Sequence, residues 1–303
     1  MSDRAIPHHL LTVGDLDRTT VAELLCRADE LRHAGQDVGE LGRGRSASLL
    51  FLTPSLRTRT GHAAAAARLG LAPVTIDELR FGMGMSASET FADTLRVVSG
   101  LTDLVITRTP FQLDRSLVER ESRAPVINGG DGGNEHPTQA LIDLAAITAE
   151  AGPVDQLRVG MVGDLGMHAA RSLVRMFELL PPVELRLIAP PGRDDPGFEL
   201  LGPLAARTRR TDSWDTDGLD VVYMVGLPEG QGAARLDDEA RALYALSADR
   251  VASLDSGAVV LCPLPRIDEI SDGARYHPSV RMFQQSDRGL FVRMAVIERL
   301  LDT

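Results

Sequence analysis

Short apolar runs alternate with amphipathic helical patterns along the whole chain. In the first half, the apolar runs predict strands at 48–52, 73–77, 104–108 and 124–128. The helical patterns predict helices from Asp15 or Asp17 to Gly35, through 63–67, over 89–98, and from His136 to about Glu150. The segment Ala-Gly-Pro-Val-Asp at 151–155 interrupts this alternation and is the best candidate for a linker.

The second half of the chain repeats the alternation. Its patterns predict strands at 157–164, 183–190, 220–225 and 258–262, and helices at 169–180 and 289–301. Strands that alternate with helices form parallel sheets covered by helices. We therefore predict an α/β fold with two doubly wound parallel-sheet domains, 1–150 and 151–288, followed by a helical segment at 289–303. Ligands of such folds bind at the carboxyl ends of the strands.

The composition limits the classes of partner. The formal net charge of −11 argues against nucleic acid, and no apolar run has the length of a membrane span. The chain has only two cysteines, Cys26 and Cys262, which favours a reducing cytoplasm over a disulfide-built fold. All 32 residues counted as Lys or Arg are arginine, so every mechanism that needs a catalytic lysine is excluded.

The sequence predicts neither a cofactor nor a metal. The turn at Gly160–Asp164 begins like a dinucleotide-binding motif, but it does not complete G-x-G-x-x-G and no acidic residue ends the next strand. Histidine, cysteine and acidic residues nowhere occur at the spacing of metal ligands.

The segment Ser55-Leu-Arg-Thr-Arg59 follows a predicted strand and begins a predicted helix. Its backbone amides, the hydroxyls of Ser55 and Thr58 and the guanidinium of Arg57 are suited to surround a phosphate. The alternative interpretation is an N-capped helix with surface arginines.

A second segment, His136-Pro-Thr-Gln139, begins a helix after a glycine-rich turn. The helix N-terminus favours a neutral imidazole, so His136 is suited to donate a hydrogen bond to a carbonyl. The alternative is a capping cluster with Pro137 in the first turn. Arg108 ends another strand, where it faces the binding edge of the sheet or is a solvated strand-end arginine. The loop Cys262-Pro-Leu-Pro-Arg266 presents carbonyls suited to bind an NH₂ group, or is a rigid exit from its strand.

Taken together, these segments resemble the transcarbamylases, and the aspartate type more than the ornithine type. The similarity extends in order over nearly the whole chain. Its landmarks are Ser55–Arg59, Glu89–Arg96, Arg108–Pro110, Gly130–Gln139, Val162–Leu165, Pro263–Ile270 and Phe283–Gln285 leading into Gly289–Arg293.

The resemblance implies a carbamoyl-phosphate domain at 1–150, an acceptor domain at 151–288, and a last helix that packs back on the first domain. It implies a homotrimer with shared active sites. The carbamoyl-phosphate residues would be Ser55, Leu56, Arg57, Thr58, Arg108, His136, Gln139, Leu264 and Pro265. Among these, Arg57, Thr58, Arg108 and His136 would be catalytic, with Glu89 orienting Arg57 and no covalent intermediate formed.

The chain departs from the family pattern where the acceptor would bind. The family's loop lysine falls at about Ala87, and the arginine after Gly-Asp-Leu falls at His168 or Ala169, with Arg171 displaced. Gly226 and Pro228 replace an arginine and a glutamine, and Cys262 replaces a histidine. The absence of a buried charge-assisted hydrogen bond to the acceptor would cost about 1.5–3 kcal/mol of binding free energy. The acceptor residues would then be His168, Arg171, Gly226, Leu227 and Arg266.

These departures lead to our hypothesis for the function: a carbamoyltransferase that carbamoylates a small amine or amino acid other than aspartate. The alternatives are a true aspartate carbamoyltransferase and a non-catalytic paralogue that binds similar ligands.

Overall fold

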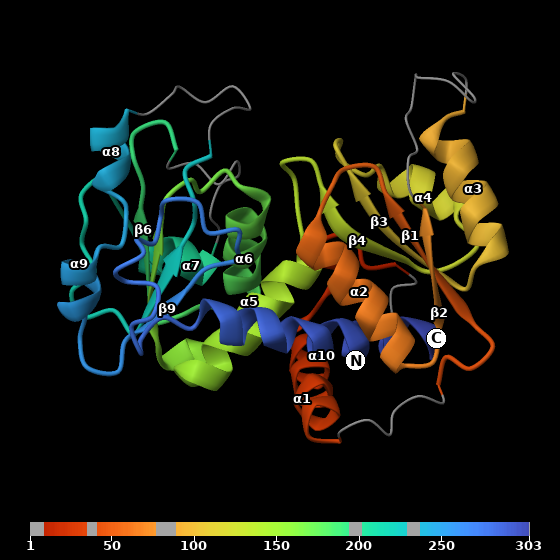
Figure 1. Cartoon of the computed structure of the whole chain (residues 1–303), viewed down its shortest axis with the longest axis horizontal. Helices are drawn as coiled ribbons and strands as arrows, with labels where there is room; N and C mark the ends of the chain where they lie inside the picture. The colour runs from red at the N-terminus through yellow and green to blue at the C-terminus, as the bar shows by residue number, and fades with distance from the viewer. Residues whose placement is uncertain (1–8, 35–40, 77–88, 194–201, 229–236, 303) are drawn as a thin grey trace. The chain divides into compact units, whose positions relative to one another are not determined.

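The computed structural model describes residues 9–34, 41–76, 89–193, 202–228 and 237–302. The chain divides into two compact units. The first contains the residues up to Thr138 together with those from Gly289 onward, and the second is Gln139–Arg288. Each unit contains one sheet whose strands all pair in parallel, which confirms the predicted α/β fold (Figure 1).

The sheet of the first unit has the strand order β2-β1-β3-β4. Its strands are β1 Ser46–Phe51, β2 Ala72–Ile76, β3 Leu104–Thr109 and β4 Val126–Asp131. Its helical elements are η1 Val13–Asp15, α1 Arg18–His33, α2 Leu56–Arg68, α3 Phe91–Leu101 and α4 Arg115–Glu121. The chain moves from β1 outward to β2 and then returns to the other side of β1, so the strand order reverses between β1 and β3. In doubly wound sheets, ligands bind at this reversal point.

The core of the first unit forms around β1, β3 and β4, which are buried along most of their length. The register pairs Ala47 with Leu104 and Phe51 with Arg108, which aligns the carboxyl ends of β1 and β3. One buried cluster consists of Leu11, Leu50, Leu95, Val105, Leu113, Val118, Ala124 and Val126. The β3–β4 register shifts between Thr107 and Thr109, and this irregularity lies at the binding edge.

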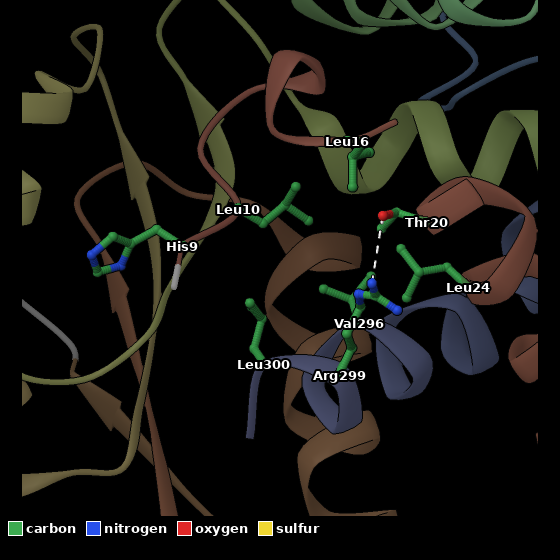
Figure 2. A pocket seen from close by; sticks show the side chains of 8 residues that line it. All are labelled: His9, Leu10, Leu16, Thr20, Leu24, Val296, Arg299 and Leu300. Carbon is green, nitrogen blue, oxygen red and sulfur yellow. Dashed lines mark hydrogen bonds between the residues drawn. The ribbon is translucent and has the colours of Figure 1, made fainter. Parts of the chain in front are cut away.

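The end of α10 (Met282–Leu301) belongs to the first unit, as the resemblance implied. Ion pairs join it to α1, because Arg27 contacts Glu298 at 2.6 Å and Arg299 contacts Glu23 at 2.7 Å. Figure 2 shows a small apolar cavity beside these contacts, lined by His9, Leu10, Leu16, Thr20, Leu24, Val296, Arg299 and Leu300. Its volume of about 20 Å³ is too small for a substrate.

The sheet of the second unit has the order β7-β6-β5-β8-β9. Its strands are β5 Arg158–Val162, β6 Glu184–Ile188, β7 Thr208–Thr211, β8 Val221–Met224 and β9 Val259–Leu261. Its helical elements are α5 Pro137–Glu150, η2 Val154–Gln156, α6 His168–Leu179, α7 Gly202–Arg207, α8 Asp238–Ala242 and α9 Ala248–Ala252. Here the order reverses between β5 and β8, where Val162 pairs with Met224. The core includes Val162, Ile188, Val222, Met224, Leu246, Val260 and Ile270.

The structure differs from the predicted elements in three respects. The chain passes from the first unit to the second between Thr138 and Gln139, so most of α5 belongs to the second unit rather than the first. Helix α10 begins at Met282, seven residues before the predicted start. The sequence patterns also missed β7, whose residues Thr-Arg-Arg-Thr carry no apolar run, and the short helices α4, α7, α8 and α9.

Candidate active site

The first turn of α2 lies directly after β1, at the reversal point of the first sheet. Ser55 is the N-cap with extended backbone, and its side chain makes no capping hydrogen bond. The first turn contains no acidic residue, whereas Arg57 and the buried Thr58 both lie within it. An N-terminus of this kind leaves backbone N–H groups for an anion. The local geometry of this segment is therefore suited to an anion.

Arg108 is held in place by the glycine-rich end of β4. Its Nη1 donates to the carbonyl of Gly129 at 2.7 Å. Gly130 has a φ of +112°, and a Cβ at this position would lie 2.3 Å from the same nitrogen. Only glycine fits here, because the backbone is left-handed and the guanidinium packs against it. The register shift between β3 and β4 thus places Arg108, as bulges beside active sites commonly do.

His136 lies next to these groups, just before α5. It is 3% exposed, its Nε2 is 3.4 Å from Thr58 Oγ1 and its Nδ1 is 3.2 Å from Thr138 Oγ1. A Cβ on Gly130 would be 3.4 Å from the imidazole Cδ2. The structure therefore brings Thr58, Arg108 and His136 together, although they come from three separate segments.

The electrostatics of this cluster favour an anion. Burial lowers the pKa of Arg108, and the neighbouring positive charge of Arg57 lowers it further. An arginine keeps its proton in proteins, so the shift reports two cations held close together. Bringing a negative ligand between them relieves this repulsion.

A buried histidine within α2 was not marked by any sequence pattern. His62 is fully buried, and its Nδ1 is 2.8 Å from the carbonyl of Thr58. Burial and the nearby Arg293 lower its pKa to about 3. Arg293 packs closely against α2 at Gly61, where a Cβ would be 2.6 Å from the guanidinium and would force it to shift. The signal in the sequence was Gly61 inside a helix, where glycine is unfavourable.

In the second unit, Gln139 is oriented by the buried carboxylate of Asp143. Its Nε2 donates to Asp143 Oδ1 at 2.7 Å. Asp143 also accepts from Tyr223 Oη and Gln285 Nε2, each at 2.6 Å. Burial raises the pKa of Tyr223 well above its ordinary value, and Asp143 adds to the shift. A carboxylate only accepts hydrogen bonds, so the amide nitrogen of Gln139 faces it and Oε1 is left as the acceptor.

The loop after β9 is fixed by the same network. The backbone N–H of Cys262 donates to Gln285 Oε1 at 2.8 Å, and its Sγ donates to Glu269 at 3.3 Å. Burial raises the pKa of Cys262 well above its ordinary value. Leu264 has a φ of +57° and precedes a cis bond to Pro265. A left-handed leucine is strained, and such residues concentrate at functional sites.

The candidate acceptor residues lie on separate elements of the second unit. His168 and Arg171 are half-buried in the first turns of α6, and Gly226 and Leu227 follow β8. Arg266 donates to the carbonyl of Ile270 at 2.6 Å and to Asp272 at 2.8 Å, so its guanidinium ties its own loop together.

Two arginines near these residues were not predicted. Arg193 contacts Asp164 and the carbonyl of Pro228, and Arg241 contacts Asp268 and the carbonyl of Leu227. No motif marks either residue, because their partners are distant in the sequence.

Some expectations lie outside the described residues or remain predictions. Ala87 and its loop fall in 77–88 and are not described. Glu89 accepts a hydrogen bond from Thr94 Oγ1 at 3.1 Å, and its orienting role toward Arg57 stays a prediction. Among the described residues, no group of three or more His, Cys, Asp or Glu is placed to hold a metal ion. The described helices include none with the length and apolar character needed to span a membrane.

Comparisons with known proteins identify the family. Residues 8–149 match the family described as "Aspartate/ornithine carbamoyltransferase, carbamoyl-P binding domain". A relative named aspartate carbamoyltransferase catalytic subunit, from Methanococcus maripaludis strain C6, is 32% identical over 97% of this chain and 98% of its own length. The chain belongs to the aspartate/ornithine carbamoyltransferase family. The resemblance seen in its motifs is thereby confirmed.

Solved carbamoyltransferase structures have the same fold. The catalytic subunit of M. jannaschii aspartate transcarbamoylase is 29% identical with a TM-score of 0.86, and the alignment covers 98% of both chains. The Trypanosoma cruzi enzyme in complex with N-(phosphonacetyl)-L-aspartic acid is 28% identical with a TM-score of 0.88, covering 96% of this chain and 94% of that one. The protein is therefore a transferase with two parallel-sheet α/β domains.

These comparisons correct the expectation of an acceptor other than aspartate. Several relatives that match this carbamoyltransferase over nearly its full length, including one from Archaeoglobus fulgidus at 32% identity, are named for aspartate. The expectation was wrong because it rested on replaced side chains at a few positions, about 87, 168, 226, 228 and 262. Contacts to a carboxylate can come from other elements of a fold, so these replacements do not identify the acceptor.

Proposed function

We propose that the protein transfers the carbamoyl group of carbamoyl phosphate to the amine of L-aspartate, forming carbamoyl aspartate and phosphate. The observation that carries this proposal is the similarity over 97% of the chain to aspartate carbamoyltransferase catalytic subunits. A solved T. cruzi relative in complex with both carbamoyl phosphate and aspartate supports the same pair of substrates.

In this proposal the first unit binds the donor. The phosphate is bound by the N–H groups of the first turn of α2, by the hydroxyls of Ser55 and Thr58, and by Arg57. This placement uses the uncapped helix N-terminus and the positive charge of its first turn.

The carbonyl oxygen of the carbamoyl group is polarised by Thr58, Arg108 and His136. If the Thr138 hydroxyl donates to Nδ1 of His136, the ring proton is on Nε2, beside Thr58. The amine nitrogen attacks the carbamoyl carbon, and these donors stabilise the oxyanion that forms. The bond from carbon to the phosphate oxygen then breaks, and the phosphate takes the amine proton. No enzyme group is covalently modified.

The second unit supplies the remaining contacts in the proposal. Gln139 Oε1 and the carbonyls of Leu264 and Pro265 accept hydrogen bonds from the carbamoyl NH₂. The acceptor binds along the first turns of α6, at His168 and Arg171, and at the loop that follows β8. The support is that α6 and this loop follow neighbouring strands at the reversal point of the second sheet.

Two further parts of the proposal concern assembly and location. We propose a homotrimer with active sites shared between subunits, which the resemblance implies. We propose a cytoplasmic location from the low cysteine content. Light scattering on the purified protein gives the mass in solution, and a monomer mass at assay concentration would contradict the trimer.

The function is tested with the purified protein, carbamoyl phosphate and L-aspartate. We expect release of phosphate and formation of carbamoyl aspartate in equal amounts. Colorimetry measures the phosphate, and mass spectrometry measures the carbamoyl aspartate. L-ornithine serves as the control acceptor. Phosphate release that does not depend on aspartate, or turnover of ornithine alone, would contradict the proposal.

A pair of variants assigns the activity to the site. Arg57→Ala and His136→Ala should remove activity while circular dichroism stays unchanged. Activity retained in both variants would show that the turnover occurs elsewhere.

A further inference from the structure

Arg193 is a buried arginine that follows β6 in the second unit. It is 5% exposed, and it closes a turn in which its N–H donates to the carbonyl of Pro190 at 3.0 Å. Its Nη1 donates to Asp164 Oδ2 at 2.5 Å and to the carbonyl of Pro228 at 3.1 Å. The two hydrogens of one nitrogen thus bind two different segments of the chain.

The two segments joined by Arg193 lie at the reversal point of the second sheet. Asp164 is in the turn between β5 and α6, and Pro228 is in the loop that follows β8. β5 and β8 are neighbours, and the strand order reverses between them. Their backbones also approach closely here, because a Cβ on Gly163 would lie 1.8 Å from the carbonyl oxygen of Val225. Ligands of doubly wound sheets bind at this place.

The surroundings of Arg193 show which role it has. Its charge is compensated by Asp164, whose other oxygen accepts from the N–H of Gly166 at 3.0 Å. A buried guanidinium that is paired with an aspartate in this way does not serve to bind a substrate carboxylate. Instead, the charge-assisted bonds fix the distance between the turn before α6 and the loop after β8.

A second arginine holds the same loop from another side. Arg241 donates to the carbonyl of Leu227 at 2.6 Å and pairs with Asp268 at 2.5 Å. The successive carbonyls of Leu227 and Pro228 are therefore each bound by an arginine that is itself paired with an aspartate. A loop of this kind has little freedom to move relative to its neighbours.

We propose that Arg193 is a positioning residue for the acceptor: through Pro228 and Asp164 it sets the spacing between loop 225–228 and the first turns of α6. The proposal rests on the proposed function, in which these two segments bind aspartate. Arg193 thus connects the two segments on either side of the reversal point. The side chains at 226 and 228 supply no cation there.

The test compares Arg193→Met, Arg193→Lys and Arg209→Met. Arg209 lies on β7 with its side chain 69% exposed, so it is the matched control. In Arg193→Met we expect the KM for aspartate to rise about tenfold, the size of one hydrogen bond to a charged group. The KM for carbamoyl phosphate and kcat should change much less. Arg193→Lys should recover part of the affinity, and Arg209→Met should match the wild type.

A second readout does not depend on turnover. Hydrogen exchange should become faster at the amides of Val225, Gly226 and Leu227 and at Gly166 in Arg193→Met, while the core strands keep their protection. If the wild type does not use aspartate, the proposed function fails, and exchange still tests the positioning role.

Two outcomes would overturn the inference. One is an equal rise in KM for both substrates in Arg193→Met with no recovery in Arg193→Lys. The other is unchanged exchange at 225–227. If Arg193→Met does not fold, the same measurements are made on Arg193→Lys and Asp164→Asn. Wild-type values in both of these variants would overturn the inference.

Discussion

The two sheets reverse their strand order at equivalent places, between β1 and β3 in one and between β5 and β8 in the other, but the arginines at the two places have different charged neighbours. At the first reversal point, Arg57 and Arg108 stand close enough for one to lower the pKa of the other. At the second, Arg193 and Arg241 each pair with an aspartate and bind a backbone carbonyl. Two arginines held close together favour an anion between them, whereas an arginine paired with an aspartate can position the backbone that it binds.

The largest expected effect comes from removing a cation at the first reversal point. Arg108→Met should lower kcat about 10²–10³-fold, because the variant lacks a preorganised donor to the developing oxyanion. Steady-state kinetics measure the effect. Arg120→Met, at a side chain 62% exposed on α4, is the matched control and should keep the wild-type rate. Equal values of kcat in the two variants would show that Arg108 does not take part in the reaction.

The pH dependence of stability tests the buried histidine behind the donor site. His62 has a pKa of about 3 in the fold, below its unfolded value of about 6.5. Above pH 6.5 both states are neutral and the residue has no effect. As the pH falls from 6.5 toward 3, the unfolded chain takes up a proton that the folded chain does not.

The free energy of unfolding should therefore fall by up to about 1.4 kcal/mol per pH unit through this residue. Urea denaturation at several pH values between 7.5 and 4.5 measures the slope. In His62→Phe, a ring of similar size without a titrating group, the slope should be correspondingly smaller. Parallel slopes for variant and wild type would show that His62 is protonated in the fold.

A smaller effect is expected from the hydrogen-bond network of the second unit. Tyr223→Phe removes a donor to the buried carboxylate of Asp143 and should lower the free energy of unfolding by about 1–3 kcal/mol. Chemical denaturation measures it. Tyr276→Phe, at a side chain 78% exposed, should stay within about 0.5 kcal/mol of the wild type. If Tyr223→Phe left the free energy of unfolding unchanged, the hydrogen bonds of Asp143 would be satisfied without the phenol.

The sequence patterns predicted the strands that are apolar along their length and the helices with clear boundaries. Strands β1, β3, β5 and β8 lie where the runs indicated, and Asp17 is the N-cap of α1, accepting from the N–H of Thr20 at 2.8 Å. The sequence patterns did not predict strand β7, because it pairs only with β6 at the edge of the sheet and is polar. Short helices such as α8 and α9 have too few residues to show a period.

By itself, the sequence determined the order of the elements, the family and the candidate donor residues Ser55, Arg57, Thr58, Arg108 and His136. It could do so because each of these residues lies in a short motif at the end of a strand or the start of a helix, and the motifs together resemble those of the family. The tertiary structure alone decided which arginines are compensated and which groups are buried. Arg193 finds Asp164 and Pro228 at separations of 29 and 35 residues, and His62 loses its proton affinity through burial and the distant Arg293. Charge compensation and desolvation depend on neighbours in space, and only the folded chain sets those neighbours.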